Sequence, residues 1–223
     1  MRAWHSYQKM RRLVGWLLRN RGFQSRRAGL SDRHYLHVGC GPQIAPGFVN
    51  LDYRWVPGVD VVWDLARPLP FPANRFRGVF SEHCLEHFDL AELAGILTEI
   101  HRVLEPGGRV RLVVPSLEIH ARTYLAARDK TPGSREDGPA REINRVFYSG
   151  HDRMQNLRWR NEGHQFIHDE ASLGRLLDAA GFTSVTPAAC GQGVDPALVI
   201  DRADRAPESL YLEAVKPSPP SRS

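Results

Sequence analysis

The segment His34–Pro42 reads HYLHVGCGP, and Asp52 follows it at the end of a second apolar run, Phe48–Leu51. Tyr35 to Val38 is typical of a short buried strand, and the two glycines after it remove side chains from the turn. Backbone N–H groups in such a turn approach a ligand closely, because no Cβ intrudes. In a parallel sheet the Asp52 carboxylate would lie beside this turn and could accept hydrogen bonds from a ribose diol. Together the two features predict an adenosine-containing cofactor.

A glycine turn alone occurs in many strand-to-loop connections. The order of the remaining elements therefore decides whether this turn is a cofactor site or an ordinary connection. Further strands are expected at residues 59–65, 77–83 and 109–114, and the first two end in polar residues. A helix is expected over residues 85–104, where apolar residues recur at helical spacing. A helix capped by Asp169 and strands at 183–189 and 210–215 complete the pattern. This order predicts an α/β, doubly wound sheet with one ligand-binding edge.

At this level of detail the chain resembles the Rossmann-like, class I S-adenosylmethionine-dependent methyltransferases. The resemblance runs from about Tyr35 to Pro115 and resumes from His164 to Pro217. It rests on a series of motifs in order: HVGCGP, NLD, DLARPLPFP, SEHCLEH, LEPGGRV and HQFIHDEASLGRLLDAAGF. It implies a seven-stranded, mostly parallel sheet with an N-terminal amphipathic helix, and S-adenosylmethionine as the cofactor.

The resemblance also implies how the cofactor is held. Gly39 and Gly41 would line its methionine part, and Asp52 would bind the ribose hydroxyls. Other residues would surround the adenine or close the site from the fourth strand: Asp64 and Leu65 at the adenine, and Ser81, Glu82 and His83 at the strand end. His37 occupies the position where the family usually has an acidic residue, and Cys40 is expected to fill a tight space in the turn.

The first crossover of the sheet is unusually short. Only ten residues separate Gly41 from Asp52, and Pro42, Pro46 and Gly47 are among them. Parallel crossovers normally need a dozen or more residues, usually including a helix. We therefore expect a loop or a single turn here, as in a bacterial subgroup of the family that has this shortened connection.

Charge divides the chain into a basic N-terminal helical arm, residues 1–34, and a methyltransferase domain, residues 35–216. The arm has nine Lys and Arg against Asp32 alone, a net charge of +8. Because the net charge of the whole chain is +5, the remaining residues have a net charge of −3. Its apolar residues share one helical face, which predicts a helix docked on the domain or a lid over the cofactor. Peripheral contact with anionic lipid is the alternative, and the confinement of charge to the arm disfavours a nucleic-acid partner.

Three further expectations follow from composition. Residues 116–163 form an insertion at the sheet edge that would make the acceptor pocket, with short helices at 119–127 and 141–147. The Pro- and Ser-rich tail, residues 217–223, should be disordered. Three scattered cysteines and the lack of a long apolar run favour a cytoplasmic protein, while the oligomeric state is left open.

Histidine is the residue type that could supply a base for methyl transfer. The segments expected at the sheet edge carry His83, His87, His151, His164 and His168. An imidazole accepts a proton from a hydroxyl or ammonium acceptor near neutral pH, whereas a carboxylate or thiolate acceptor needs positioning alone. We take His83, His87 and His164 as candidate catalytic residues. A hydrogen-bonded structural role is the alternative for each.

His83-x-x-Glu86-His87 also combines metal-ligand residue types on one helical turn, and His164 or His168 could add another. Certain small-RNA 2′-O-methyltransferases of this fold hold a divalent metal in a comparable cluster. The family, however, commonly carries Leu-Glu-His here without a metal. We therefore expect no metal and keep the cluster as the alternative.

Three classes of function are compatible with these patterns. The leading one is a methyltransferase that acts on a small-molecule acceptor, a sugar or a natural-product intermediate. The second is the same enzyme acting on a peptide, protein or RNA through the basic arm. The third is a non-catalytic cofactor-binding module or a nicotinamide enzyme, although Pro42-Gln43 replaces the third glycine that a dinucleotide fingerprint needs.

Overall fold

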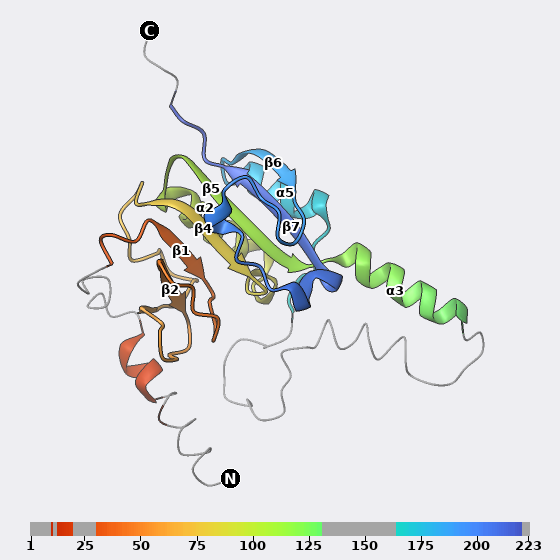
Figure 1. The fold of residues 1–223 in the computed structure, drawn as a ribbon, viewed down its shortest axis with the longest axis horizontal. Helices are drawn as coiled ribbons and strands as arrows, with labels where there is room; N and C mark the ends of the chain where they lie inside the picture. The colour runs from red at the N-terminus through yellow and green to blue at the C-terminus, as the bar shows by residue number, and fades with distance from the viewer. Residues whose placement is uncertain (1–9, 11–12, 20–29, 131–163, 220–223) are drawn as a thin grey trace.

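The computed structural model describes residues 10, 13–19, 30–130 and 164–219 (Figure 1). After a short helix at residues 13–18, the elements are, in chain order, β1 (Tyr35–Val38), β2 (Phe48–Asp52), β3 (Val61–Val62), β4 (Phe76–Glu82), η2 (Leu85–His87), α2 (Leu90–Val103), β5 (Leu104–Pro115), α3 (Leu117–Lys130), α5 (Glu170–Ala179), β6 (Thr183–Pro187), η3 (Pro196–Leu198), η4 (Ala203–Glu208) and β7 (Ser209–Val215).

The strands form one seven-stranded sheet in the order β3-β2-β1-β4-β5-β7-β6. Strands β1 to β5 pair in parallel, and β7 pairs antiparallel with both β5 and β6. The chain order reverses between β1 and β4, which places a switch point at the carboxyl ends of these two strands. The mostly parallel, seven-stranded Rossmann-like sheet expected from the sequence is therefore confirmed.

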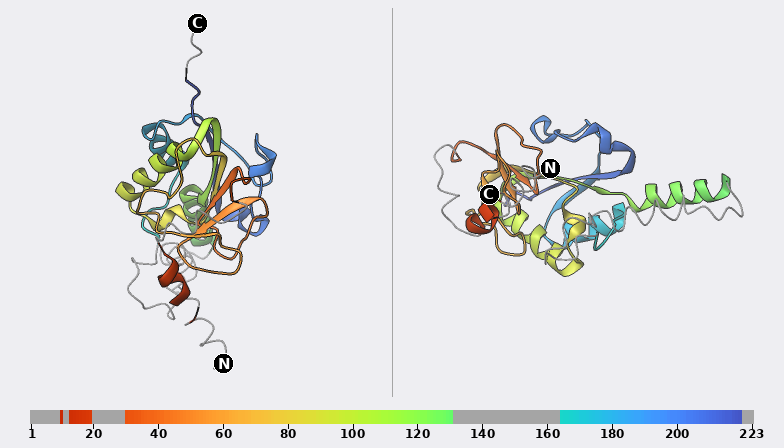
Figure 2. Two further views of the ribbon diagram at one scale, coloured as in Figure 1. Left: turned by 90° about the vertical axis from the view of Figure 1, so that its left-hand side faces the viewer. Right: turned by 90° about the horizontal axis from the view of Figure 1, so that it is seen from below.

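Helices α2 and α5 cover one face of this sheet, where they bury the main apolar core (Figure 2). Helix α2 begins after Asp89, whose side chain accepts a hydrogen bond from the Glu92 amide at 2.8 Å. Because Phe88 is extended and Asp89 caps a new helix, the single helix expected over residues 85–104 is wrong: the segment forms η2 and then α2. Helix α5 begins at a capping box of Asp169 and Ser172, as the Asp169 cap predicts.

The opposite face is covered by irregular chain rather than by long helices among the described residues. The connection between β1 and β2 contains no helix, as its length predicts. Residues 188–208, which join β6 to β7 and include η3 and η4, lie over this face (Figure 2). A second apolar cluster fills the interface between them: Ala45, Phe48, Phe80, Val113, Leu198 and Tyr211.

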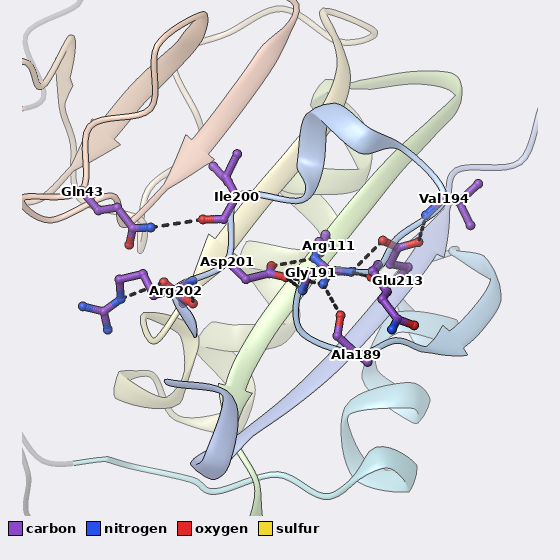
Figure 3. Close-up of polar contacts among 11 residues, drawn as sticks. Gln43, Arg111, Ala189, Gly191, Val194, Ile200, Asp201, Arg202 and Glu213 are labelled. Atoms are coloured by element: carbon purple, nitrogen blue, oxygen red, sulfur yellow. Dashed lines mark hydrogen bonds and ion pairs between the residues drawn. The ribbon is translucent and has the colours of Figure 1, made fainter. Parts of the chain in front are cut away.

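A buried ionic network fastens residues 188–202 to the sheet (Figure 3). Arg111 of β5 is fully buried and donates to Asp201 at 2.7 and 2.5 Å and to Glu213 of β7 at 2.8 Å. Its remaining N–H groups reach the carbonyls of Ala189 and Gln192, both at 2.9 Å. A buried guanidinium is tolerated when its charge and its donors are all matched in this way.

Some expected elements differ in extent or lie outside the described residues. The strand expected at 59–65 is reduced to Val61–Val62, and the helix expected at 119–127 extends over Leu117–Lys130 and projects from the body (Figure 1). The helix expected at 141–147, residue His151 and most of the insertion fall outside the described residues. In the described part of the chain, no helix has the length and apolar character needed to cross a membrane.

Replacing Arg111 with Met should lower the free energy of unfolding by about 3–5 kcal/mol, because two buried carboxylates lose their counter-charge. Urea denaturation followed by circular dichroism measures this. The matched control is Arg122→Met, whose ion pair with Glu118 on α3 is largely exposed and is worth at most about 1 kcal/mol. Adding Asp201→Asn and Glu213→Gln to Arg111→Met should recover part of the loss. A single variant as stable as the control would contradict this account.

Candidate functional site

The glycine turn after β1 is bound to the end of β2 by three backbone amides. Gly39 and Cys40 donate to the Leu51 carbonyl at 2.9 and 3.1 Å, and Gly41 donates to Asp52 Oδ2 at 2.8 Å. The structure therefore brings Gly39, Gly41 and Asp52 together at the switch point, as the sequence predicts. This is the edge at which open α/β sheets bind their ligands.

The two glycines serve the turn differently. Both have positive φ, +68° for Gly39 and +52° for Gly41. A Cβ on Gly39 would overlap the Cys84 side chain, whereas a Cβ on Gly41 would meet no atom of the described residues within 4 Å. Gly39 therefore allows close packing between the ends of β1 and β4, and Gly41 leaves open space beside its Cα.

Two carboxylates stand at the ends of β2 and β3. Asp52 is half-buried, and its Oδ1 accepts from the Arg54 amide at 2.7 Å. Asp64 Oδ1 accepts from the Ala66 amide at 3.1 Å. Leu65 contributes its side chain to the main apolar core. These contacts fix the loops that carry the expected ribose and adenine residues, whose roles stay predictions.

Other residues expected around the cofactor are buried. The His37 ring lies between Phe48 and Phe80, with ring centroids 6.3 and 5.1 Å away. Cys40 is 3% exposed, and burial raises the pKa of its thiol, which fits the expected packing role. Ser81 is also buried. The part these residues would take toward the cofactor stays a prediction.

Glu82, at the end of β4, holds the segment that covers the second sheet face. Its carboxylate accepts hydrogen bonds from the Arg202 amide and from Arg202 Nε, both at 3.0 Å. Sequence reasoning missed Arg202, because a charged run between two strands is typical of a solvent-exposed loop. Gln43, just after the glycine turn, donates to the Ile200 carbonyl at 3.2 Å from the other side (Figure 3).

A second group of polar side chains surrounds Glu86 of η2, at the carboxyl end of β4. Glu86 Oε1 lies 3.6 Å from His83 Nδ1, 3.9 Å from His87 Nε2 and 3.8 Å from His164 Nε2. Glu86 is 1% exposed, and neither of its carboxylate oxygens has a hydrogen-bond partner among the described residues. The structure therefore gathers all three candidate catalytic histidines around one buried carboxyl group.

The hydrogen bonds of His83 fix its tautomer. Ser209 donates its only hydroxyl proton to the Arg205 carbonyl at 2.7 Å, so its oxygen accepts from His83 Nε2–H at 2.8 Å. The bare Nδ1 then faces Glu86. Because β7 lies beyond β5, the ring leans along the sheet edge away from the glycine turn. A contact between His83 and the transferred methyl group stays a prediction.

Burial dominates the electrostatics of this group. It raises the pKa of the Glu86 carboxyl to about 8 and lowers the pKa of His83 and of His164 to about 4. His83 also has a positive φ of 48°, a strained conformation for a residue with a side chain. His168 differs: it is fully buried, its ring packs on Phe166, and it lies outside the group around Glu86.

The short helix at residues 13–18 lies near the end of β2. Arg19 at its end donates to the Tyr53 carbonyl at 3.3 Å, and its guanidinium stacks 3.6 Å above the Tyr53 ring. Leu18 packs against the small apolar cluster around Cys40 and Val56. The end of the helix therefore contacts Tyr53, the residue next to Asp52, and lies beside the expected ribose position.

Strand order, glycine turn and acidic strand end together match one class of fold. They resemble those of the Rossmann-like, class I S-adenosylmethionine-dependent methyltransferases. A family model described as a methyltransferase domain matches residues 41–112, about a third of the chain, and covers the region from the glycine turn to β5.

Solved structures resemble the chain at low sequence identity. A CurJ carbon methyltransferase is 13% identical, with 87% of this chain and 51% of that chain covered and a TM-score of 0.46. A 1,6-didemethyltoxoflavin-N1-methyltransferase from Burkholderia thailandensis is 17% identical (82% and 71% covered, TM-score 0.46). A phosphoethanolamine N-methyltransferase 2 from Haemonchus contortus is 12% identical (92% and 52% covered, TM-score 0.48). The chain thus spans about half the length of the first and third. No curated protein sequence matches.

Replacing Asp52 with Ala should weaken binding of S-adenosylhomocysteine by about tenfold or more per lost bond, because a charge-assisted hydrogen bond is worth roughly 1.5–3 kcal/mol. Isothermal titration calorimetry measures the affinity. Asp52→Asn, which keeps one acceptor for the Gly41 amide, should show a smaller loss. Asp178→Ala on the exposed side of α5 is the control. Unchanged affinity in Asp52→Ala would contradict the assignment.

Replacing His37 with Leu should make unfolding less sensitive to acid. Burial lowers the pKa of His37 to about 4 from an ordinary 6.5, so between these values the unfolded chain binds a proton that the folded chain does not. Stability is therefore lost as the pH falls through this window, by up to about 3 kcal/mol for this residue. Urea titrations at pH 7 and pH 4.5 should show a smaller loss in the variant. Equal losses would contradict the prediction.

Proposed function

We propose that this protein transfers the methyl group of S-adenosylmethionine to a small-molecule acceptor, such as a sugar or a natural-product intermediate. The observation that carries the proposal is the hydrogen bond between the Gly41 amide and Asp52 at the switch point of the sheet. It holds an open glycine backbone and a carboxylate side by side, which suits the methionine and ribose parts of one ligand.

When bound, the cofactor supplies a methyl group on a positively charged sulfur. A lone pair of the acceptor attacks the methyl carbon and displaces the sulfur in one step. The chain's own task is to align the acceptor and to receive any proton it loses. The histidines around Glu86 are compatible with this second role: burial lowers the pKa of His83 and His164 to about 4, so their rings are neutral at pH 7 and have a lone pair for a proton, although a base of this pKa is a weak one. They lie at the end of β4, the strand next to β1.

A small acceptor is supported by the limited exposure of this group. His164 and His83 expose 7% and 12% of their side chains, and only His87 is more open, at 37%. A macromolecular acceptor would need a reactive atom to reach this depth. The arm supports a role as a lid, because Arg19 and Leu18 dock beside Asp52. We also propose a reducing, cytoplasmic location, supported by three free cysteines.

The test combines an acceptor screen with a histidine variant. Purified protein is incubated with methyl-labelled S-adenosylmethionine and with sugars, hydroxylated aromatic compounds, peptides or RNA, and labelled product is counted. His83→Ala should slow turnover of the best acceptor by about 10²-fold or more if it takes the proton, with little change in cofactor affinity. His101→Ala, which lies on α2 against Phe182, is the control. Turnover of peptide or RNA alone would contradict the small-molecule proposal.

A further inference from the structure

Proton transfer requires a single base, whereas the group around Glu86 combines a carboxyl group with three histidines. Carboxylate and imidazole ligand atoms of Glu86, His87 and His164 all lie within 4.8 Å of one another. One carboxylate with two imidazoles is a donor set that divalent transition metals prefer. We propose that these three residues bind a divalent first-row transition-metal ion, best suited to Zn²⁺, which holds an oxygen atom of the methyl acceptor.

The distances require only small movements to close on an ion. Glu86 Oε1 lies 3.9 Å from His87 Nε2 and 3.8 Å from His164 Nε2. In a tetrahedral site with metal–ligand bonds of about 2.0–2.2 Å, ligand atoms lie roughly 3.3–3.5 Å apart. The two Glu86 distances therefore need to shorten by a few tenths of an ångström, and the ligand atoms of His87 and His164, which lie within 4.8 Å of each other, by at most about 1.5 Å.

The buried carboxylate is the strongest observation. Glu86 is 1% exposed, and both oxygens lack a hydrogen-bond partner among the described residues. A buried carboxyl group whose two oxygens lack partners is costly, and a bound cation would supply the missing partner. His87 and His164 are well placed to share an ion with Glu86, since the Nε2 atoms of both lie within 3.9 Å of the same oxygen, Oε1.

The backbone fixes the two ligand-bearing segments against each other. The amides of Gln165 and Phe166 both donate to the Glu86 carbonyl, at 2.7 and 3.3 Å. His164 is therefore held beside η2, although it lies 78 positions after Glu86 in the chain. Preorganised ligands of this kind are expected of a binding site rather than of a chance cluster.

His83 supports the site from outside it. Its Nε2–H is bound by Ser209, so its Nδ1 lone pair points toward the Glu86 carboxylate 3.6 Å away. A lone pair and a carboxylate oxygen that face each other favour a cation between or beside them, either a proton or a metal ion. His83 also has a positive φ of 48°, and such strain is concentrated at functional sites.

Three protein ligands leave a coordination position for a substrate atom. An acceptor hydroxyl bound there would lose its proton to water more readily, its oxygen lone pair would form the new bond to the methyl carbon, and the electron pair of the carbon–sulfur bond would stay on sulfur. This role in acceptor binding rests on the proposed function. Metal binding itself does not.

The experiment measures metal binding directly, on untagged full-length protein freed of metal with EDTA and dialysed. Zn²⁺ is added, and bound metal per chain is counted by inductively coupled plasma mass spectrometry. Co²⁺ is used in parallel, because its visible spectrum reports nitrogen and oxygen ligation. We expect one ion per chain in the wild type and an affinity at least about 100-fold weaker in Glu86→Gln and His164→Gln.

Controls separate the site from surface binding and from misfolding. His34→Gln removes an exposed histidine and should leave the stoichiometry at one. Glu86→Gln without metal should be about as stable as the wild type, since an amide of the same size replaces a buried carboxyl group, but Zn²⁺ should raise the melting temperature of the wild type only. Retained Zn²⁺ in Glu86→Gln and His164→Gln, or an equal loss in His34→Gln, overturns the proposal.

The two proposals can fail separately. Stoichiometric Zn²⁺ that depends on Glu86, in a protein that methylates none of the acceptors, supports the metal site and contradicts the proposed function. Full methyl transfer in EDTA-treated protein that binds no Zn²⁺ or Co²⁺ supports the proposed function and overturns the metal site.

Discussion

Arg111 and its two carboxylate partners form the interaction on which the rest of the structure depends. Arg111 is the largest fully buried side chain among the described residues, and Asp201 and Glu213 bracket it. A buried charge of this kind is stable only while every partner is in place. The network therefore fixes the position of residues 188–202 more tightly than an apolar contact of the same area would.

That constraint follows from the short first crossover. A ten-residue connection between Gly41 and Asp52 leaves no room for a helix, so one face of the sheet needs another cover. Residues 188–208 supply it, with Leu198 and Ile200 packed over Phe48 and Phe80. An irregular segment buries less apolar surface than a helix would, and ionic and polar anchors to the sheet make up part of the difference.

The same segment supports both halves of the candidate site. Beyond Asp201, Arg202 grips Glu82 at the end of β4, and Ser209 orients the His83 ring. On the other side, Ile200 accepts a hydrogen bond from Gln43 beside the glycine turn. Contacts made far from Asp52 and Glu86 along the chain therefore set the surroundings of both.

The fold and the geometry of the glycine turn could be predicted because their signals are local. Gly39, Gly41 and Asp52 lie within a short stretch, and the strand periods around them are regular. The network of Arg111, Asp201 and Glu213 could not be predicted, because its members are up to 102 residues apart in sequence and each looks like a surface charge. The helix break at Asp89 could not be predicted for another reason. Apolar residues recur at helical spacing on both sides of Asp89, so the pattern gives no sign that this residue caps a new helix.

The cluster around Glu86 could be predicted from the sequence only in part. His83, Glu86 and His87 share a turn and could be grouped from spacing alone, whereas the bonds from Gln165 and Phe166 to the Glu86 carbonyl are what bring His164 to them. The glycine turn packs against this cluster through the contact between Gly39 and Cys84, the residue before η2. Because that contact leaves no space for a Cβ, a shift of the glycine turn would also displace the start of the polar cluster.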